Sequence, residues 1–246
     1  MDSLRIIRIP ILPFHMVNAH LVVTNKGCIL VDTGLPGSEV RVQKTLIEHG
    51  LSLKDLKLIV VTHAHVDHAG SAARLRELSR APIIGHEGDI QYYTQEKQMA
   101  YCSTGWAGSL FLKTQIPHEP YTAFKPDILL SNATAFDLDR YGIPGTIKHS
   151  SGHTAGSISL ELDSKDALVG DLIASGILIG GITRKGRAIR PPFEDDPQAV
   201  AFELKRLLDA GFKRFYMGHG GPLDAKAVRS HIQTLMVAKR SMPSVN

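Results

Sequence analysis

The chain has 246 residues, 43% hydrophobic and 21% charged, a composition that excludes a disordered chain and fits one globular domain. Its 28 basic and 24 acidic residues give a net charge of +4, which is small for a nucleic-acid-binding protein, so a small-molecule substrate is favoured. Cys28 and Cys102 have neither metal-site spacing nor the number needed for a disulfide framework, and reduced thiols are expected.

The first residues, MDSLRIIRIPILPF, lack the continuous apolar core and the cleavage site of a signal peptide. No run reaches the roughly 18 apolar residues of a membrane span. We therefore expect a cytoplasmic protein with no membrane partner.

The first third of the chain alternates strand and helix patterns. Four segments have the pattern of strands: HLVVTN (20–25), GCILVDTG (27–34), KLIVV (57–61) and APIIG (81–85). Two segments have helical spacing: VRVQKTLIEHG (40–50) and HAGSAARLRELSR (68–80). The first two strands predict a hairpin that turns at Asn25 and Lys26.

Between His86 and Pro126 the periodicity fades, while five aromatic side chains gather on what the pattern indicates are short helices. We expect a helical cap insertion at about residues 87–126 that lies over another part of the molecule.

Strands and helices alternate again in the second half. The predicted strands are TIKHS (146–150), SISLELD (157–163), ALVGD (167–171) and KRFYMG (213–218). The predicted helices are PQAVAFELKRLLDAG (197–211) and a last one from about residue 224 to 240. This alternation favours an α/β sandwich built as a single domain over residues 1–246, with catalytic residues in the loops after strand ends.

The segment THAHVDHAG (62–70) places four possible metal ligands directly after a predicted strand. If the backbone stays extended, His63, His65 and Asp67 point the same way at period two, while His68 begins the next helix. Further candidates follow other strands beside glycines: His153, Asp171 and His219. Imidazole nitrogen and carboxylate oxygen suit Zn²⁺ and neighbouring metals, so these residues predict a metal site.

The pattern H-x-H-x-D-H, followed by a distant His, Asp and His, resembles the metallo-β-lactamase superfamily from about Asn18, through VDTG (31–34), to His219. The resemblance implies an αββα sandwich, with two mixed β-sheets face to face and helices outside. It also implies two Zn²⁺ ions per chain, with Fe or Mn as alternatives. The implied ligands are His63, His65 and His153 for one metal, Asp67, His68 and His219 for the second, and Asp171 as the bridge.

The same resemblance implies a binuclear zinc hydrolase, in which a metal-bridging hydroxide cleaves a small ester, thioester, lactone or lactam. Asp67 and Asp171 would be the catalytic carboxylates, with Asp67 moving a proton. Supporting contacts are assigned to Asp32, His20 and His149, although a turn or packing role is open for each. The basic loop Arg184–Arg190 is expected to gather an anionic group of the substrate, unless it is a solvated surface.

Departures from relatives within the family narrow this substrate class. Only 27 residues (246 minus 219) follow His219, whereas glyoxalase II enzymes carry a helical C-terminal domain there. Ala174 stands where homoserine-lactone lactonases of the family have a tyrosine. β-Lactam hydrolysis, as a main or promiscuous activity, is one alternative, and a non-haem iron persulfide dioxygenase is the alternative from another enzyme class. A metal-binding protein without turnover is the third, and the oligomeric state stays open.

Overall fold

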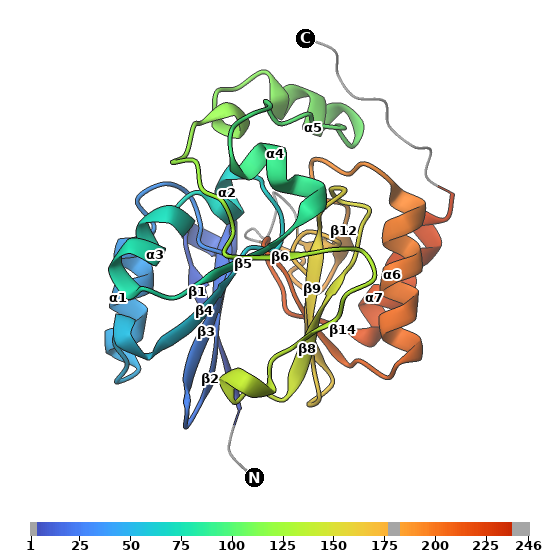
Figure 1. The fold of residues 1–246 in the computed structure, drawn as a ribbon. Coiled ribbons are helices and arrows are strands. Elements are labelled where there is room, and N and C mark those ends of the chain that lie inside the picture. The colour runs from blue at the N-terminus through green and yellow to red at the C-terminus, as the bar shows by residue number, and fades with distance from the viewer. Residues whose placement is uncertain (1–3, 177–182, 238–246) are drawn as a thin grey trace.

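The computed structural model describes residues 4–176 and 183–237, and its strands form two six-stranded mixed sheets (Figure 1). The first sheet has the order β1-β2-β3-β4-β5-β6: β1 (Arg5–Pro10), β2 (Asn18–Thr24), β3 (Gly27–Val31), β4 (Leu56–Val60), β5 (Ile83–His86) and β6 (Ile128–Leu130). Strands β1 to β3 pair antiparallel, and β3 to β6 pair parallel. The carboxyl ends of the parallel strands therefore meet at one edge.

The second sheet has the order β14-β13-β10-β9-β8-β7: β7 (Phe136–Asp137), β8 (Gly145–His149), β9 (Ile158–Leu162), β10 (Asp166–Leu168), β13 (Arg214–Tyr216) and β14 (Leu223–Asp224). Only β10 and β13 pair parallel in it. A separate two-stranded ribbon joins β11 (Ala174–Ser175) to β12 (Ala188–Ile189).

Helices cover both outer faces, so the molecule has four layers (Figure 1). Helices α1 (Glu39–Glu48) and α3 (Ala72–Ser79) cover the first sheet, and α6 (Pro197–Asp209) and α7 (Ala225–Leu235) cover the second. The remaining helices are short: α2 (Val66–Ala69), α4 (Ile90–Tyr93) and α5 (Gly105–Leu112), with single 3-10 turns at Pro13–His15, Leu53–Asp55, Glu87–Asp89, Ile116–His118 and Asp139–Tyr141.

Side-chain alternation along the strands separates three apolar cores. On β2, Val22 packs between the two sheets, whereas Leu21 and Val23 pack under α1 and α3. The core between the sheets joins residues such as Val60 of β4 to Leu160 of β9. A third core lies between the second sheet and helices α6 and α7. The αββα sandwich of two mixed sheets predicted from the sequence is therefore confirmed.

Two predicted helices differ from the observed ones. The helix predicted over 68–80 is two helices, α2 and α3, because the Ser71 hydroxyl between them donates to the Leu35 carbonyl (2.7 Å) and anchors this turn to the neighbouring loop. The last helix ends at Leu235, earlier than predicted, and residues 238–240 of the prediction lie outside the described residues. Strand β1 was not predicted, because its two arginines and terminal proline obscure the alternation.

Residues 87–126 lie between β5 and β6 and contain α4 and α5, which rise above one end of the sandwich (Figure 1). This segment is held against a distant part of the chain, since the Thr104 N–H donates to the Pro192 carbonyl (2.7 Å) and the Glu194 N–H donates to the Cys102 carbonyl (2.9 Å). Within residues 4–176 and 183–237, no helix combines the length and apolar character needed to cross a bilayer.

Candidate metal centre

The loop after β4 brings four candidate ligands to the edge where the strands end. The backbone is still extended at His65 (φ −62°, ψ 148°), as the period-two pattern requires. Asp67 differs from the prediction, because it lies in the first turn of α2 together with His68. The helical turn, rather than an extended strand, therefore aims this carboxylate at the site.

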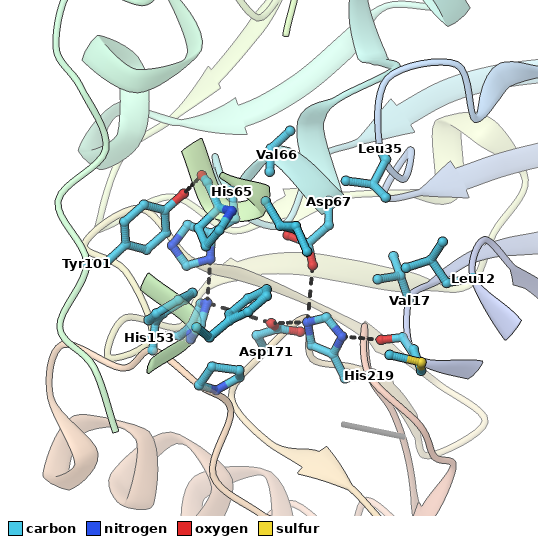
Figure 2. A pocket seen from close by; sticks show the side chains of 16 residues that line it. Leu12, Val17, Leu35, His65, Val66, Asp67, Tyr101, His153, Asp171 and His219 are labelled. Carbon is cyan, nitrogen blue, oxygen red and sulfur yellow. Dashed lines mark hydrogen bonds and ion pairs between the residues drawn. The ribbon is translucent and has the colours of Figure 1, made fainter. Parts of the chain in front are cut away.

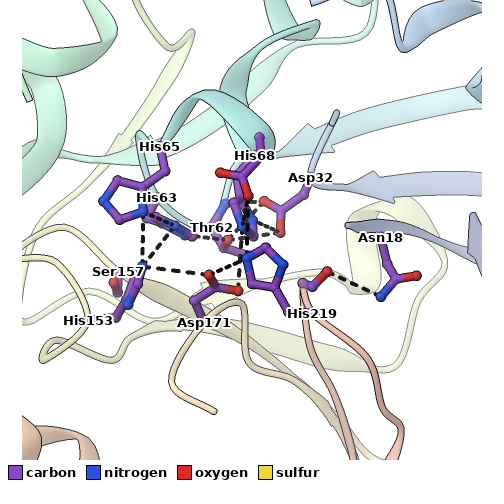
Figure 3. Close-up of polar contacts among 12 residues, drawn as sticks. Asn18, Asp32, Thr62, His63, His65, His68, His153, Ser157, Asp171 and His219 are labelled. Atoms are coloured by element: carbon purple, nitrogen blue, oxygen red, sulfur yellow. Dashed lines mark hydrogen bonds and ion pairs between the residues drawn. The ribbon is translucent and has the colours of Figure 1, made fainter. Parts of the chain in front are cut away.

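Three further ligands reach the same place from the second sheet (Figure 3). His153 lies in the loop between β8 and β9, Asp171 follows β10, and His219 follows β13. Gly218 allows this approach, because a Cβ atom there would lie 2.3 Å from Cε1 of His68 and 2.5 Å from Oδ1 of Asp171. Residues from opposite ends of the chain are thus neighbours.

Three histidines form the first group, and their ring nitrogens face one another. Nε2 of His63 lies 3.1 Å from Nδ1 of His65, and Nε2 of His153 lies 3.1 Å from each of these two atoms. All three side chains are buried. Burial lowers the pKa of His65 and His153 to about 3 and that of His63 well below its usual value, so the three rings are neutral and able to bind a metal.

The second group contains Asp67, His68 and His219. Oδ2 of Asp67 lies 3.4 Å from Nε2 of His219 and 3.9 Å from Nε2 of His68. Burial by itself would lower the pKa of both histidines. The carboxylates of Asp171 and Asp67 outweigh burial at His219 and raise its pKa to about 9. The same two carboxylates, together with Asp32, raise the pKa of His68 well above its usual value. The carboxylates therefore favour a positive charge here.

Asp171 lies between the two groups. One oxygen, Oδ2, is 2.9 Å from Nε2 of His219 and 3.8 Å from Nε2 of His153, while Oδ1 is 3.5 Å from Nε2 of His68. The side chain is almost fully buried. Asp171 is thus the one carboxylate of the described chain that contacts members of both groups, the position of the predicted bridge.

Asp32 sets which nitrogen of two ligands carries the proton. Its Oδ2 accepts a hydrogen bond from Nδ1 of His68 (2.8 Å), and its Oδ1 accepts from the Thr62 hydroxyl (2.9 Å). The Thr62 oxygen lies 3.0 Å from Nδ1 of His63 and can accept its N–H. Both histidines then direct the lone pair of Nε2 into the site, as metal ligands require. The left-handed backbone of Asp32 (φ 61°) permits this contact.

His219 is oriented in the same way by the main chain, because its Nδ1 donates to the Met16 carbonyl. Nε2 then faces the carboxylates of Asp67 and Asp171. Three of the five candidate histidines are therefore oriented with Nε2 facing the centre.

The donor set fits divalent metal ions. Three neutral ring nitrogens 3.1 Å apart repel one another unless a cation or a proton lies between them. Within the described residues, Nε2 of His68 and Oδ1 of Asp171 are buried without any hydrogen bond. Three overlapping groups of ligand atoms lie within 4.8 Å of one another: His63, His65 and His153; His63, His68 and Asp171; and Asp67, His68 and His219. Nitrogen and oxygen ligands of this kind suit zinc, iron and manganese.

Asp89 is a supporting residue that the sequence reasoning missed. Its buried carboxylate accepts from the Ala64 N–H (3.0 Å), between His63 and His65, and from the Thr154 hydroxyl (2.9 Å), beside His153. It also accepts from the Gly156 N–H (2.8 Å). Asp89 thus ties together the two loops that carry the three-histidine group, and only its position after β5 hints at this in the sequence.

Two histidines proposed as supporting residues have partners outside the ligand set. His20 is buried and packs edge-to-face against Tyr216, with ring centroids 5.8 Å apart. His149 stacks on His86 at 4.1 Å and its Nε2 lies 2.9 Å from the Ala155 carbonyl. Neither lines the pocket above the centre. Their assignment to the site stays a prediction.

The described residues of the basic loop do not reach this centre. Arg184 and Arg187 line a separate groove with His231. Arg190 pairs with the buried Glu194, with Nε 2.7 Å from Oε2. None of the three arginines lines the pocket above the centre, so the anion-gathering role stays a prediction.

Comparison with known proteins gives one consistent family. The sequence model of the metallo-beta-lactamase superfamily matches residues 12–219. The probable metallo-hydrolase YflN of Bacillus subtilis is 26% identical over 217 residues, covering 84% of this chain and 80% of that protein.

Two solved structures share the fold. One is a metallo-beta-lactamase family protein from Thermus thermophilus (TM-score 0.66, 23% identity, 94% of this chain and 77% of that one). The other is the class B3 di-zinc metallo-beta-lactamase LRA-12 from an Alaskan soil metagenome (TM-score 0.61, 19% identity, 89% and 85%).

Proposed function

This chain belongs to the metallo-β-lactamase superfamily, and from that membership we propose that it is a binuclear metal-dependent hydrolase of a small ester, thioester, lactone or lactam. The observation that carries the proposal is the position of Asp171, which contacts His153 of one ligand group and His68 and His219 of the other. A carboxylate shared in this way is the arrangement that two metal ions need.

In the proposed reaction, water adds across the acyl bond. The water oxygen forms a bond to the acyl carbon, the bond to the leaving oxygen, sulfur or nitrogen breaks, and the leaving atom takes a proton. Two divalent cations, when bound, supply Lewis acidity and lower the pKa of water from about 15.7 towards ~7. His63, His65 and His153 would hold one cation, Asp67, His68 and His219 the other, and Asp171 both.

The protein's own groups position the reactants and move the proton. Asp67 is the most exposed carboxylate of the set, with 23% of its side chain accessible, and it lines the pocket above the centre. It is therefore suited to take a proton from water at a carboxylate oxygen and pass it to the leaving group. Asp32 is not in contact with the pocket, and its role is to orient His68 and, through Thr62, His63.

The first test is metal content followed by initial rates. Protein loaded with zinc, iron or manganese is assayed with aryl esters, an acyl thioester, simple lactones, a lactam chromophore and a phosphodiester, with oxygen consumption recorded on a persulfide. We expect zinc-dependent cleavage of at least one acyl substrate. Cleavage of the phosphodiester alone, or iron-dependent oxygen consumption alone, would overturn the proposal.

A variant links that activity to the centre. We expect His65→Ala to stay folded but to lower kcat/KM by more than the roughly 10- to 100-fold that loss of an outer-shell partner costs, because a ligand itself is removed. His49→Ala, at the exposed end of α1, is the matched control and should retain full activity. An active His65→Ala protein with two bound metals would exclude the assignment.

A further inference from the structure

The pocket above the metal centre is apolar apart from the ligands themselves (Figure 2). The empty space, including its open mouth, is about 760 Å³. Five of its lining residues belong to the ligand set: His65, Asp67, His153, Asp171 and His219. The others are leucine, isoleucine, valine, methionine, proline and phenylalanine side chains together with Tyr101.

Three distant parts of the chain build this wall. Leu12 and Val17 come from the segment between β1 and β2, Phe111 from α5 of the 87–126 segment, and Phe193 from the segment before α6. Phe193 packs against the 87–126 segment, since its ring centroid lies 5.8 Å from that of Phe111 and 4.6 Å from that of Tyr101. Tyr101 in turn lies 4.9 Å from the ring of His65, so the apolar wall continues directly from a metal-ligand candidate.

Polar groups near the pocket are turned away from it or paired. The Tyr101 hydroxyl is paired, because it donates to the Pro117 carbonyl. Among the described residues, no lysine or arginine lines the pocket. A charged group on the substrate would therefore lose its hydration here without gaining a partner other than the centre itself.

From this lining, we infer that the substrate carries an uncharged apolar acyl group, a medium-length alkyl chain or an aryl ring, which fills the space between Leu12, Phe111 and Phe193 while its carbonyl faces the ligands. This inference rests on the proposed function, because the acyl carbon is placed at the metal centre. An anionic substrate, suggested by the basic loop, is the competing outcome.

A series of p-nitrophenyl esters tests the inference by rate. From acetate through butyrate and hexanoate to octanoate, kcat/KM should rise by about fourfold per methylene, the factor that corresponds to ~0.8 kcal/mol per buried methylene, until the pocket is full. Rates that are flat or fall with chain length would overturn it.

Two variants on one helix locate the effect. Phe111→Asp should abolish the dependence of kcat/KM on chain length, because it places a charge in the apolar wall. Trp106→Asp, also on α5 but 81% exposed and outside the pocket, should keep the wild-type dependence. If both variants show the same dependence of kcat/KM on chain length, the acyl group does not lie against Phe111.

Binding without turnover separates this inference from the proposed function. Calorimetry on the zinc-loaded protein compares acetohydroxamate with hexano- and octanohydroxamate, and octanohydroxamate with suberic monohydroxamate, whose chain ends in a carboxylate. Affinity that rises with chain length and falls with the carboxylate supports the apolar pocket even if no ester is cleaved. Ester cleavage with tighter binding of the carboxylate-ended ligand would overturn the inference while the hydrolase proposal stands.

Discussion

Single buried carboxylates determine how the ligand histidines are presented. Asp32 fixes His68 directly and His63 through Thr62, while Asp89 fixes the main chain around Ala64 and Thr154. The Ala64 carbonyl is held as well, because the Tyr121 hydroxyl donates to it (3.0 Å). The geometry of the three-histidine group therefore depends on residues that do not touch a metal.

Asp89→Asn tests this dependence. Both oxygens of Asp89 accept hydrogen bonds, and the NH₂ group that replaces one of them in asparagine cannot accept. The loops that carry His63 and His153 should therefore separate. We expect metal affinity at the three-histidine group to fall about 10- to 100-fold, measured by competition with a chromophoric chelator at equal folded fraction. Glu87→Gln, exposed in the same turn, should bind metal normally. Wild-type affinity in Asp89→Asn would show that this carboxylate serves stability alone.

Glu194 gives a prediction for pH. Burial raises its pKa to about 7 from 4.5, despite the ion pair with Arg190. The folded chain therefore keeps this proton to a higher pH than the unfolded chain, and the contribution of Glu194 to stability falls as pH rises from about 4.5 to about 7. In urea unfolding, the free energy of the wild type minus that of Glu194→Gln should decrease across this window and level off above it. A difference that increases with pH would contradict the assignment.

At the scale of elements, the site depends on where strands and helices end. Strands β4, β10 and β13 each deliver ligands directly after their last paired residues, and glycine at position 218 lets the last of these segments pack against His68. Helix α6 begins beside the centre, because the Asp196 N–H donates to the Gly152 carbonyl (2.8 Å), next to His153.

The start of α6 offers a test of element stability. The Asp196 side chain accepts hydrogen bonds from the N–H groups of Gln198 (3.0 Å) and Ala199 (3.1 Å), and Pro197 occupies the first turn. Asp196→Ala should lower the free energy of unfolding by about 1 kcal/mol. Asp209→Ala, at the other end of the helix, removes only a surface pair with Lys205 and should cost less than about 0.5 kcal/mol. An equal cost in both variants would argue against the cap.

For the whole molecule, the ligands come from both sheets, so bound metal should hold the two halves of the sandwich together. If free zinc is about 100 times the dissociation constant, binding stabilises the fold by ~2.7 kcal/mol per site. For a chain of this size each kcal/mol corresponds to roughly 2–4 °C in Tm, so a chelator should lower Tm by about 5 °C or more. Scanning calorimetry with zinc, with chelator and after re-addition of zinc measures this change.

His65→Ala should show a smaller chelator effect on Tm than the wild type, because one of the two ligand groups is incomplete. A wild-type Tm that is the same with zinc and with chelator would mean that metal does not link the two sheets.

Patterns within a few residues of one another were predictable from the sequence. The apolar runs of β2, β3 and β4 and the amphipathic patterns of α1 and α6 predicted elements that the structure contains. Short elements were missed: β6, β7 and β14 have two or three residues each, too few for a period to be visible, and they form because neighbouring strands pair with them.

What the sequence by itself determined is the kind of chemistry: ligand types, their spacing at 63–68 and their positions after strands are local and can be read along the chain. Only the tertiary structure decided that Asp89 joins two ligand loops, that Arg184 and Arg187 line a different groove, and that Leu12, Phe111 and Phe193 form one wall. The physical reason is that contacts between residues far apart in the chain arise from packing of the whole sandwich, and no local period records them.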